Sequence, residues 1–337
     1  MRVRLLLDSV MAASMLALLG TSIAGRPVLA GPAQQVHLNP VIDLLQQHKP
    51  VFGLYAPSNR RHGAAVTSEP RPTPLEMAKE TVAYRYSDYL FDGSMEHDYS
   101  HGLQSFSAYA QALHDVAPVQ RSASTLKYPL VVKMHPIGSD YDTATRHIGE
   151  QLDLGVTSVI FVQVESAEEL RRGIAAMRYR EHGGTRADRV GVAPARWGLS
   201  DREYRRKADV WPLNPEGELV VQAIVESKEG LKNLREIAAV KGIGVLFPGA
   251  GSLRAEFSTT GADGKRTLDE AAWEGAIQQV LAACREFDVP CGYPANEKDI
   301  ELRMQQGFSV FIIGWGEPGF RAVDIGRRLG GRTTLSE

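Results

Sequence analysis

The sequence predicts an α/β fold in which eight strands alternate with helices as a (β/α)8 TIM barrel. Apolar strand candidates recur eight times along the chain, and helical patterns lie between most of them. The strands are expected at residues 51–55, 89–91, 130–133, 158–164, 220–225, 244–247, 290–293 and 309–313. The helices are expected at residues 73–84, 143–154, 167–177, 228–240 and 271–287. One barrel domain is therefore expected over residues 51–330.

An open, doubly wound sheet is the competing prediction. That fold requires a glycine-rich phosphate turn after its first strand. Here the first strand continues into Ala56-Pro57-Ser58-Asn59, so the barrel is favoured. Residues 178–216 are rich in Arg, Gly and Pro and form an extended connection after the fourth strand. Loops of this length are often functional.

The first thirty residues have the pattern of a secretory signal peptide. Arg2 and Arg4 precede a mostly apolar stretch over 5–25, and Val28-Leu29-Ala30 offers small side chains for cleavage after Ala30. A retained N-terminal anchor and a mis-assigned start codon are the alternatives. Residues 31–50 then form a short N-terminal segment. No later apolar run approaches the roughly 20 residues that span a bilayer, so a secreted or periplasmic protein without a membrane attachment is expected.

Composition and charge place few other limits on function. The 337 residues are 43% apolar and 23% charged, which is typical of a globular protein with a large core. The net charge of -2 argues against a nucleic-acid partner. Cys284 lies on a predicted helix and Cys291 beside a predicted strand, so a disulfide is possible but not required. Neither is in a metal-ligand motif, and both are expected to pack in the core.

Residues 220–254 deliver two polar groups to one edge of the predicted sheet. The strand at 220–225 ends on Glu226, and the strand at 243–247 runs into Pro248-Gly249-Ala250-Gly251-Ser252. A helix joins the two strands, which should be parallel neighbours. Because an unpaired charge is costly at the end of a buried strand, Glu226 is expected to serve a ligand, a metal or a fixed partner. A structural salt bridge is the alternative.

Other predicted strands also end on polar residues, and in a barrel these ends build the active site. The candidates are Asp92, Glu96, His97, Lys133, His135, Gln163, Glu165, Glu226, Ser252, Asn296, Glu297 and Glu317. Lys133 and His135 are two residues apart, so a strand would direct both to the same side. An imidazole, an amine and several carboxylates suit acid–base or metal-assisted chemistry.

Short blocks spread over residues 51–329 resemble the HpcH/HpaI aldolases, which are divalent-metal-dependent class II aldolases acting through a pyruvate enolate. The blocks are Met95-Glu96-His97, Leu152-Asp153-Leu154-Gly155, Ala176-Met177-Arg178-Tyr179, Ala195-Arg196-Trp197, Val225-Glu226-Ser227, Leu231-Lys232-Asn233-Leu234, Phe247-Pro248-Gly249 and Gly307-Phe308. Their order and spacing along a predicted barrel carry the resemblance.

The resemblance implies a site with a metal and an acid–base histidine. In the family, a Glu after strand five and an Asp after strand six hold the metal, and hard oxygen ligands suit Mg²⁺ or Mn²⁺. Glu226 matches the metal Glu, and His97 matches the acid–base His of an Asp-x-Glu-His motif. Four other positions depart from the family pattern. Ser252 stands at the metal Asp, Ser94 at the Asp of the motif, Lys133 at a carbonyl-polarising Arg, and Ile224 at a Gln.

These departures change the expected chemistry. Ser252 removes one negative charge and a strong ligand, and Lys133 keeps a positive charge without the planar fork of Arg. One hypothesis is a rebuilt metal site of His97, His135 and Glu226. Another makes Lys133 an amine nucleophile or a fixed cation.

The resemblance implies a carbon–carbon lyase of the aldolase type for a small 2-oxo acid or related carbonyl compound. His97, Lys133 and His135 are the expected catalytic residues, and Lys133, Gly249 and Ser252 the expected substrate-binding residues. Glu226 is the expected ligand of a divalent metal (Mg²⁺ or Mn²⁺), with Ser252 at the second-ligand position. Self-association into a homo-oligomer is also implied. The alternatives are a secreted binding protein for small organic acids, and a hydrolase or isomerase on the same barrel.

Overall fold

A curled sheet of parallel strands forms the centre of the chain. The computed structural model describes residues 36–59, 72–120 and 125–334. The eight predicted strands are β1 (Val51–Tyr55), β2 (Tyr89–Asp92), β3 (Leu130–Lys133), β4 (Ser158–Phe161), β6 (Leu219–Val225), β7 (Ile243–Pro248), β10 (Gly292–Ala295) and β11 (Val310–Ile313). They pair in parallel in the order β10-β11-β1-β2-β3-β4-β6-β7, and β5 (Val210–Trp211) also pairs with β6. The predicted α/β class and its eight strands are confirmed.

One isolated parallel β-bridge connects β7, at one end of this strand order, with the residue before β10, at the other end. Leu246 of β7 pairs with Cys291, which directly precedes β10. The Leu246 amide donates to the Pro290 carbonyl over 3.0 Å. The sheet therefore curls far enough to bring β7 beside the start of β10, as in a TIM-barrel-like fold.

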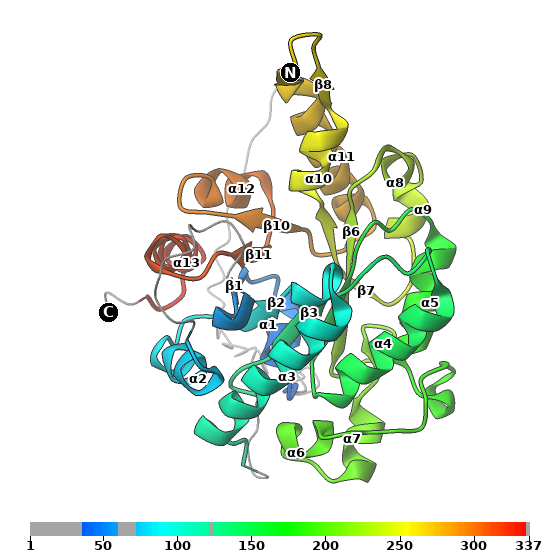
Figure 1. Cartoon of the computed structure of the whole chain (residues 1–337), viewed down its shortest axis with the longest axis vertical. Helices are drawn as coiled ribbons and strands as arrows, with labels where there is room; N and C mark the ends of the chain where they lie inside the picture. Colours follow the sequence, from blue (N-terminus) through cyan, green and yellow to red (C-terminus); the bar gives the residue numbers. More distant parts are fainter. Residues whose placement is uncertain (1–35, 60–71, 121–124, 335–337) are drawn as a thin grey trace, which may run out of the picture. The chain divides into compact units, whose positions relative to one another are not determined.

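Helices lie around the strands (Figure 1). They are α2 (Pro74–Ala83), α3 (Tyr99–Val116), α4 (Tyr141–Asp153), α5 (Ala167–Met177), α6 (Ala193–Trp197), α7 (Asp201–Lys207), α8 (Lys228–Lys232), α9 (Leu234–Ala238), α10 (Ala250–Glu256), α11 (Glu270–Glu286), α12 (Ile300–Gln306) and α13 (Glu317–Leu329). Side-chain caps fix the start of several: Asp140 accepts from the Thr143 amide, Ser166 from the Glu169 amide and Asp269 from the Ala272 amide. In the described residues, no helix is both long and apolar enough to cross a membrane.

The main differences from the sequence prediction are a divided helix, a shortened strand and an additional hairpin. The helix expected over 228–240 is divided at Asn233, whose side-chain amide donates to the Glu165 carbonyl (2.8 Å) and to Glu229 Oε1 (3.0 Å). The fourth strand ends at Phe161, because Gln163 adopts a left-handed backbone with φ of 47°. A short hairpin of β8 (Ser258–Thr260) and β9 (Arg266–Leu268) follows α10.

Alternate strand residues divide the core into two clusters. One cluster lies inside the curled sheet and includes Val131, Ile160, Ile224 and Phe247. It also contains Val41, Ile42 and Leu45 of α1 (Pro40–Gln46), which pack with residues at the amino ends of the strands. The larger cluster lies between the sheet and the helices. Since side chains alternate along a strand, Lys133 and Glu226, two residues beyond Val131 and Ile224, belong to the inner face at the carboxyl end.

The extended connection over 178–216 is held by buried polar pairs. Asp209 is 1% exposed and accepts from Arg178 over 2.5 and 3.1 Å and from Asn214 over 2.9 Å. Burial alone would raise the pKa of Asp209, but these hydrogen bonds lower it overall. Trp197 donates its indole N–H to the Gly155 carbonyl over 2.8 Å. These contacts give the connection a structural role.

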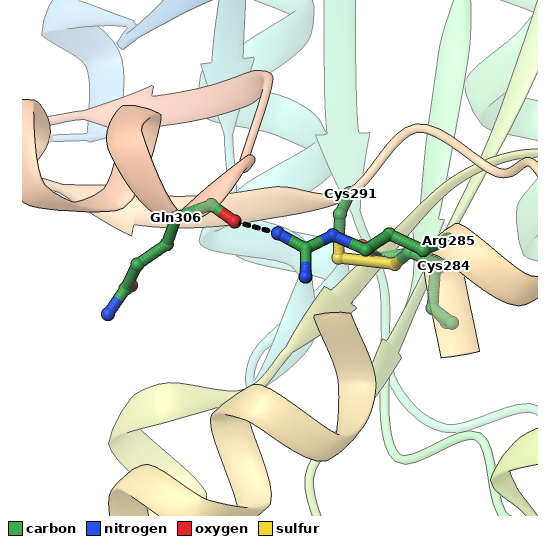
Figure 2. The surroundings of a disulfide bond; sticks show 5 residues. Cys284, Arg285, Cys291 and Gln306 are labelled. Atoms are coloured by element: carbon green, nitrogen blue, oxygen red, sulfur yellow. Dashed lines mark hydrogen bonds between the residues drawn. A yellow bond between two sulfur atoms is a disulfide. The ribbon is translucent and has the colours of Figure 1, made fainter. Parts of the chain in front are cut away.

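The two cysteines form a disulfide between the end of α11 and the residue before β10. Figure 2 shows Cys284 bonded to Cys291, with the neighbouring Arg285 donating to the Gln306 carbonyl at the end of α12. Cys284 is 2% exposed and Cys291 3%. The expected core packing of both residues is confirmed, and the disulfide that the sequence left open is present.

Candidate active site

A lysine–glutamate ion pair lies where β2 and β3 end. Lys133 is the last residue of β3, and its Nζ lies 2.8 Å from Oε2 of Glu96. Glu96 belongs to a 3-10 turn, η2 (Ser94–Glu96), that follows β2. The two side chains are 19% and 20% exposed, so the pair is shielded but accessible to a small ligand. An ammonium group has three N–H donors, and within the described residues it pairs with Glu96.

His97 lies beside this pair and faces solvent. Its Nε2 is 3.8 Å from Glu96 Oε2, and its side chain is 88% exposed. The structure thus brings together two of the three expected catalytic residues, Lys133 and His97, through one carboxylate. The exposed imidazole is free to exchange protons with solvent or with a ligand above the ion pair.

His135 is engaged elsewhere. Its Nε2 lies 2.8 Å from Nδ1 of His147 on α4, and its Nδ1 lies 3.1 Å from the Pro136 carbonyl. Because a carbonyl only accepts, His135 Nδ1 carries the hydrogen and Nε2 accepts from His147. The His147 ring stacks on Tyr99 with ring centroids 3.3 Å apart. Both His135 nitrogens therefore have protein partners on the α3–α4 side, which leaves little capacity for stabilising an oxyanion.

Burial, with a further contribution from His135, lowers the pKa of His147. Glu150 on the same helix opposes this effect, and Arg146 adds to it. The lowered pKa favours the neutral form of the His147 ring.

Glu226 and Ser252 form the second half of the site. Glu226 follows β6, and Oε2 accepts a 2.7 Å hydrogen bond from the Ser252 hydroxyl on α10. Oε1 accepts a 3.0 Å hydrogen bond from the backbone N–H of Gln163. The left-handed backbone at Gln163 places this N–H, and the sequence offers no signal for it. Glu226 is 7% exposed and is fixed by two donors.

Gly249 makes room for this carboxylate. A Cβ at position 249 would overlap the Cβ of Glu226 and lie 2.7 Å from its Oε2. The expected role of Gly249 in binding substrate is not tested by this geometry. Its closeness to Glu226 shows that it shapes the carboxylate's surroundings.

The residues present do not fit the divalent-metal site that the resemblance implies. In the family pattern, a Glu and an Asp hold the ion, which keeps open coordination positions. Glu226 supplies one, both of its oxygens accept hydrogen bonds from the protein, and the second ligand position is the neutral Ser252. Within the described residues, no group of three His, Cys, Asp or Glu side chains is arranged to hold a metal. The structure therefore does not bring His97, His135 and Glu226 together as a set of metal ligands in the described part of the chain.

A further buried carboxylate organises the loops after β1 and β2. Asp92 is 1% exposed and accepts hydrogen bonds from Ser58 Oγ (2.7 Å) and from the backbone N–H of Ser94 (2.9 Å). Burial raises the pKa of Asp92, against the effect of these hydrogen bonds. Asp92 and Glu96 are strand-end candidates in the sequence, but the sequence assigns neither a role. Asp92 is the last residue of β2 and Glu96 lies in the turn after it, within the Met95-Glu96-His97 block of the family resemblance.

The parallel strand arrangement and its charged carboxyl ends define an α/β enzyme of the barrel-like class, and comparison with known proteins identifies its family. A model described as "HpcH/HpaI aldolase/citrate lyase" matches residues 103–314. The chain belongs to the HpcH/HpaI aldolase/citrate lyase family.

Similar proteins agree with this assignment. The chain is 32% identical to a pyruvate aldolase of Rhizobium etli, across 72% of this chain and 83% of that protein. It is 28% identical to a hydroxypyruvate/pyruvate aldolase of Cupriavidus necator, across 61% of this chain and 73% of that protein. The structure of a family member from Burkholderia cenocepacia has a TM-score of 0.62 at 19% identity, covering 87% of this chain and 96% of that one. The structural likeness concerns the fold.

Proposed function

We propose that this chain is a carbon–carbon lyase of the aldolase type, acting on a small 2-oxo acid or a related carbonyl compound. Family membership supports an aldolase-like lyase. The observation that carries the proposal is the Lys133–Glu96 pair at the carboxyl end of β3, on the same inner face as Glu226. A cation fixed there is suited to stabilise negative charge that develops on a carbonyl oxygen.

The substrate class is proposed from the relatives and from the charge of the site. The relatives named above are aldolases of pyruvate and hydroxypyruvate. A 2-oxo acid carries a carboxylate and an adjacent carbonyl, both of which attract an ammonium group. We propose that Lys133 orients this pair of oxygens, while Gly249 and Ser252 border the substrate on the Glu226 side.

His97 is the proposed acid–base group. The position matches the acid–base histidine of the family motif, and the exposed imidazole can be reached by a ligand above the ion pair. In the synthetic direction, the imidazole accepts a proton from the carbon next to the carbonyl and returns it to the alkoxide formed on the aldehyde. His135 is a weaker candidate for a direct role, since His147 and Pro136 occupy its nitrogens.

The Mg²⁺ or Mn²⁺ that the resemblance implies stays an expectation. The donor set around Glu226 does not support it, and no step proposed for these residues uses a metal ion.

Location, assembly and barrel closure are also proposals. A site outside the cytoplasm is supported by the signal-peptide pattern over residues 1–30, which lies outside the described residues, and by the disulfide in Figure 2, because disulfides persist in oxidising compartments. Self-association is proposed from family resemblance. Full closure of the (β/α)8 barrel is proposed from the Leu246–Cys291 bridge.

Turnover of a panel of 2-oxo acids, each offered with a series of aldehydes, tests the proposed function. We expect wild-type protein to form an aldol product from at least one pair. The variants His97→Ala and Glu226→Ala should lose most of this turnover while keeping the wild-type unfolding midpoint within a few degrees. Binding of an oxo acid without any turnover would favour the alternative of a binding protein for small organic acids. Hydrolysis or isomerisation without carbon–carbon chemistry would favour a hydrolase or isomerase on the same barrel.

A further inference from the structure

We infer that this site stabilises the enolate of its substrate without a divalent cation, and that Lys133 is its fixed positive charge. The inference rests on the proposed lyase function and deepens it. It departs from the metal-dependent chemistry that the family resemblance implies, and it follows from the contacts of Glu226 and Lys133.

Glu226 occupies the position of the metal-binding Glu of the family. A carboxylate that binds Mg²⁺ or Mn²⁺ must direct at least one oxygen to the ion. Each oxygen of Glu226 accepts one hydrogen bond from the protein, from the Gln163 amide at 3.0 Å and from the Ser252 hydroxyl at 2.7 Å, and Ser252 adds no second carboxylate for an ion. The family pattern has a charged metal ligand at position 252, whereas Ser252 donates a hydrogen bond to Glu226. This hydrogen bond and the one from the Gln163 amide hold the Glu226 carboxylate in place beside the site.

Apolar side chains lie beside Glu226 on the inner face. Ile224 is 8% exposed and lies two residues before Glu226 on the inner face, where Val162 and Phe247 also pack. These apolar side chains offer no oxygen to an ion. A lysine charge is carried by the chain itself and needs no set of oxygen ligands to hold it, and the electrostatic effect of a charge is larger beside apolar groups than in water.

Lys133 supplies the positive charge of the site. Its side chain is 19% exposed, and its Nζ is held 2.8 Å from Glu96 Oε2, which restrains the position of the charge. One carboxylate engages one N–H direction, and the others are available for substrate oxygens. Lys133 therefore offers the donors and the charge that the reaction needs.

The reaction balances with these groups. The neutral His97 imidazole takes the proton from the carbon beside the carbonyl. The C–H electron pair becomes the carbon–carbon double bond, and the carbonyl electrons move to oxygen, which the Lys133 ammonium stabilises without losing its proton. The enolate carbon then bonds to the aldehyde carbon, and the imidazolium gives its proton to the new alkoxide. Cleavage follows the reverse sequence.

The experiment uses the full chain and Mn²⁺ as the probe. Wild-type protein is treated with a chelator, and its metal content is checked by elemental analysis. Mn²⁺ binding is then measured by calorimetry and by the unfolding midpoint for wild type, Ser252→Asp and the matched control Ser252→Ala. We expect wild type and Ser252→Ala to show no Mn²⁺-dependent midpoint shift. Ser252→Asp, which restores a second carboxylate, should bind Mn²⁺ about tenfold or more tightly than wild type and should be stabilised by it.

A second pair of variants tests the lysine. Lys133→Met should lower turnover about 100-fold, and Lys133→Arg, which keeps the charge, should recover part of it. Wild-type turnover should change less than twofold after chelation. If chelation abolishes wild-type turnover and Mn²⁺ or Mg²⁺ restores it, or if wild type binds Mn²⁺ as tightly as Ser252→Asp, the inference is overturned and the lyase proposal stands. If no oxo acid is turned over, the lyase proposal fails, and the metal-binding measurements alone still decide whether Glu226 is a ligand.

Discussion

The ammonium of Lys133 lies 2.8 Å from the Glu96 carboxylate and connects the ends of β2 and β3. Glu96 comes from a turn of only three residues, η2, whereas Lys133 is the last residue of a buried strand. The strand fixes the base of the lysine, and the turn fixes its tip. This relationship makes Glu96 a positioning residue.

Replacing Glu96 by Gln should therefore lower activity more than stability. The ammonium would lose its charged partner and sample more orientations, and we expect kcat to fall about tenfold. Because the pair is partly exposed, the free energy of unfolding should change by about 1 kcal/mol or less. Kinetics with an active oxo acid and urea unfolding measure the two effects. Glu229→Gln, which removes an exposed partner of Lys232 on α8, is the matched control and should change neither.

Gly249 offers a test of how tightly Glu226 is held. Gly249→Ala places a Cβ against the Cβ of Glu226, so the carboxylate must move. We expect a loss of about 1–3 kcal/mol in stability and a clear loss of turnover.

Gly251→Ala is the matched control for this substitution. Position 251 lies on α10, and a methyl group added there would meet nothing within 4 Å, so stability should stay within about 0.5 kcal/mol of wild type. Equal effects of the two substitutions on turnover would show that Glu226 is not displaced.

The His135–His147 pair should make stability depend on pH. The pKa of His147 is lowered in the folded protein, so the folded state binds fewer protons than the unfolded state as the pH falls. This contribution to stability is complete above the ordinary histidine pKa of about 6.5 and is lost as the pH falls through the lower, folded value.

Unfolding midpoints between pH 7.5 and pH 5 measure this effect. His147→Gln should reduce the loss in free energy of unfolding between pH 7.5 and pH 5 by about 0.5 kcal/mol. The value is small because the His147 ring is partly solvated. His101→Gln, on an exposed position of α3, should keep the wild-type slope. An unchanged slope in His147→Gln would mean that another group titrates.

The disulfide should contribute measurably to stability. It closes a short loop, with a sequence separation of seven residues between Cys284 and Cys291. We expect the double substitution to Ser to cost about 2–3 kcal/mol. Thiol titration of unreduced, denatured protein should find no free thiol. Two free thiols in protein purified from an oxidising compartment would contradict the pairing.

The sequence predicted the parts of this molecule that depend on local pattern. Apolar runs identified the eight strands, and the ends of those strands located Lys133 and Glu226 at the carboxyl edge of the sheet. Contacts with distant helices were beyond that pattern: the partner of His135 is a histidine on α4, and Asn233 divides a helix because it binds a carbonyl after β4. The hydrogen bond from the Gln163 backbone N–H to Glu226 depends on the left-handed backbone of Gln163. The sequence did not predict this conformation, because residues other than glycine adopt it only rarely.

Exchange of the α-protons of pyruvate and other 2-oxo acids in D₂O, followed by proton NMR, tests the central claim most directly. Exchange requires the enolate but no aldehyde partner. Wild-type protein should exchange the protons of at least one oxo acid well above the buffer rate, and Lys133→Met should reduce that rate about 100-fold. Exchange at the buffer rate for every oxo acid, or an equal rate in Lys133→Met, would contradict an enolate site built on Lys133.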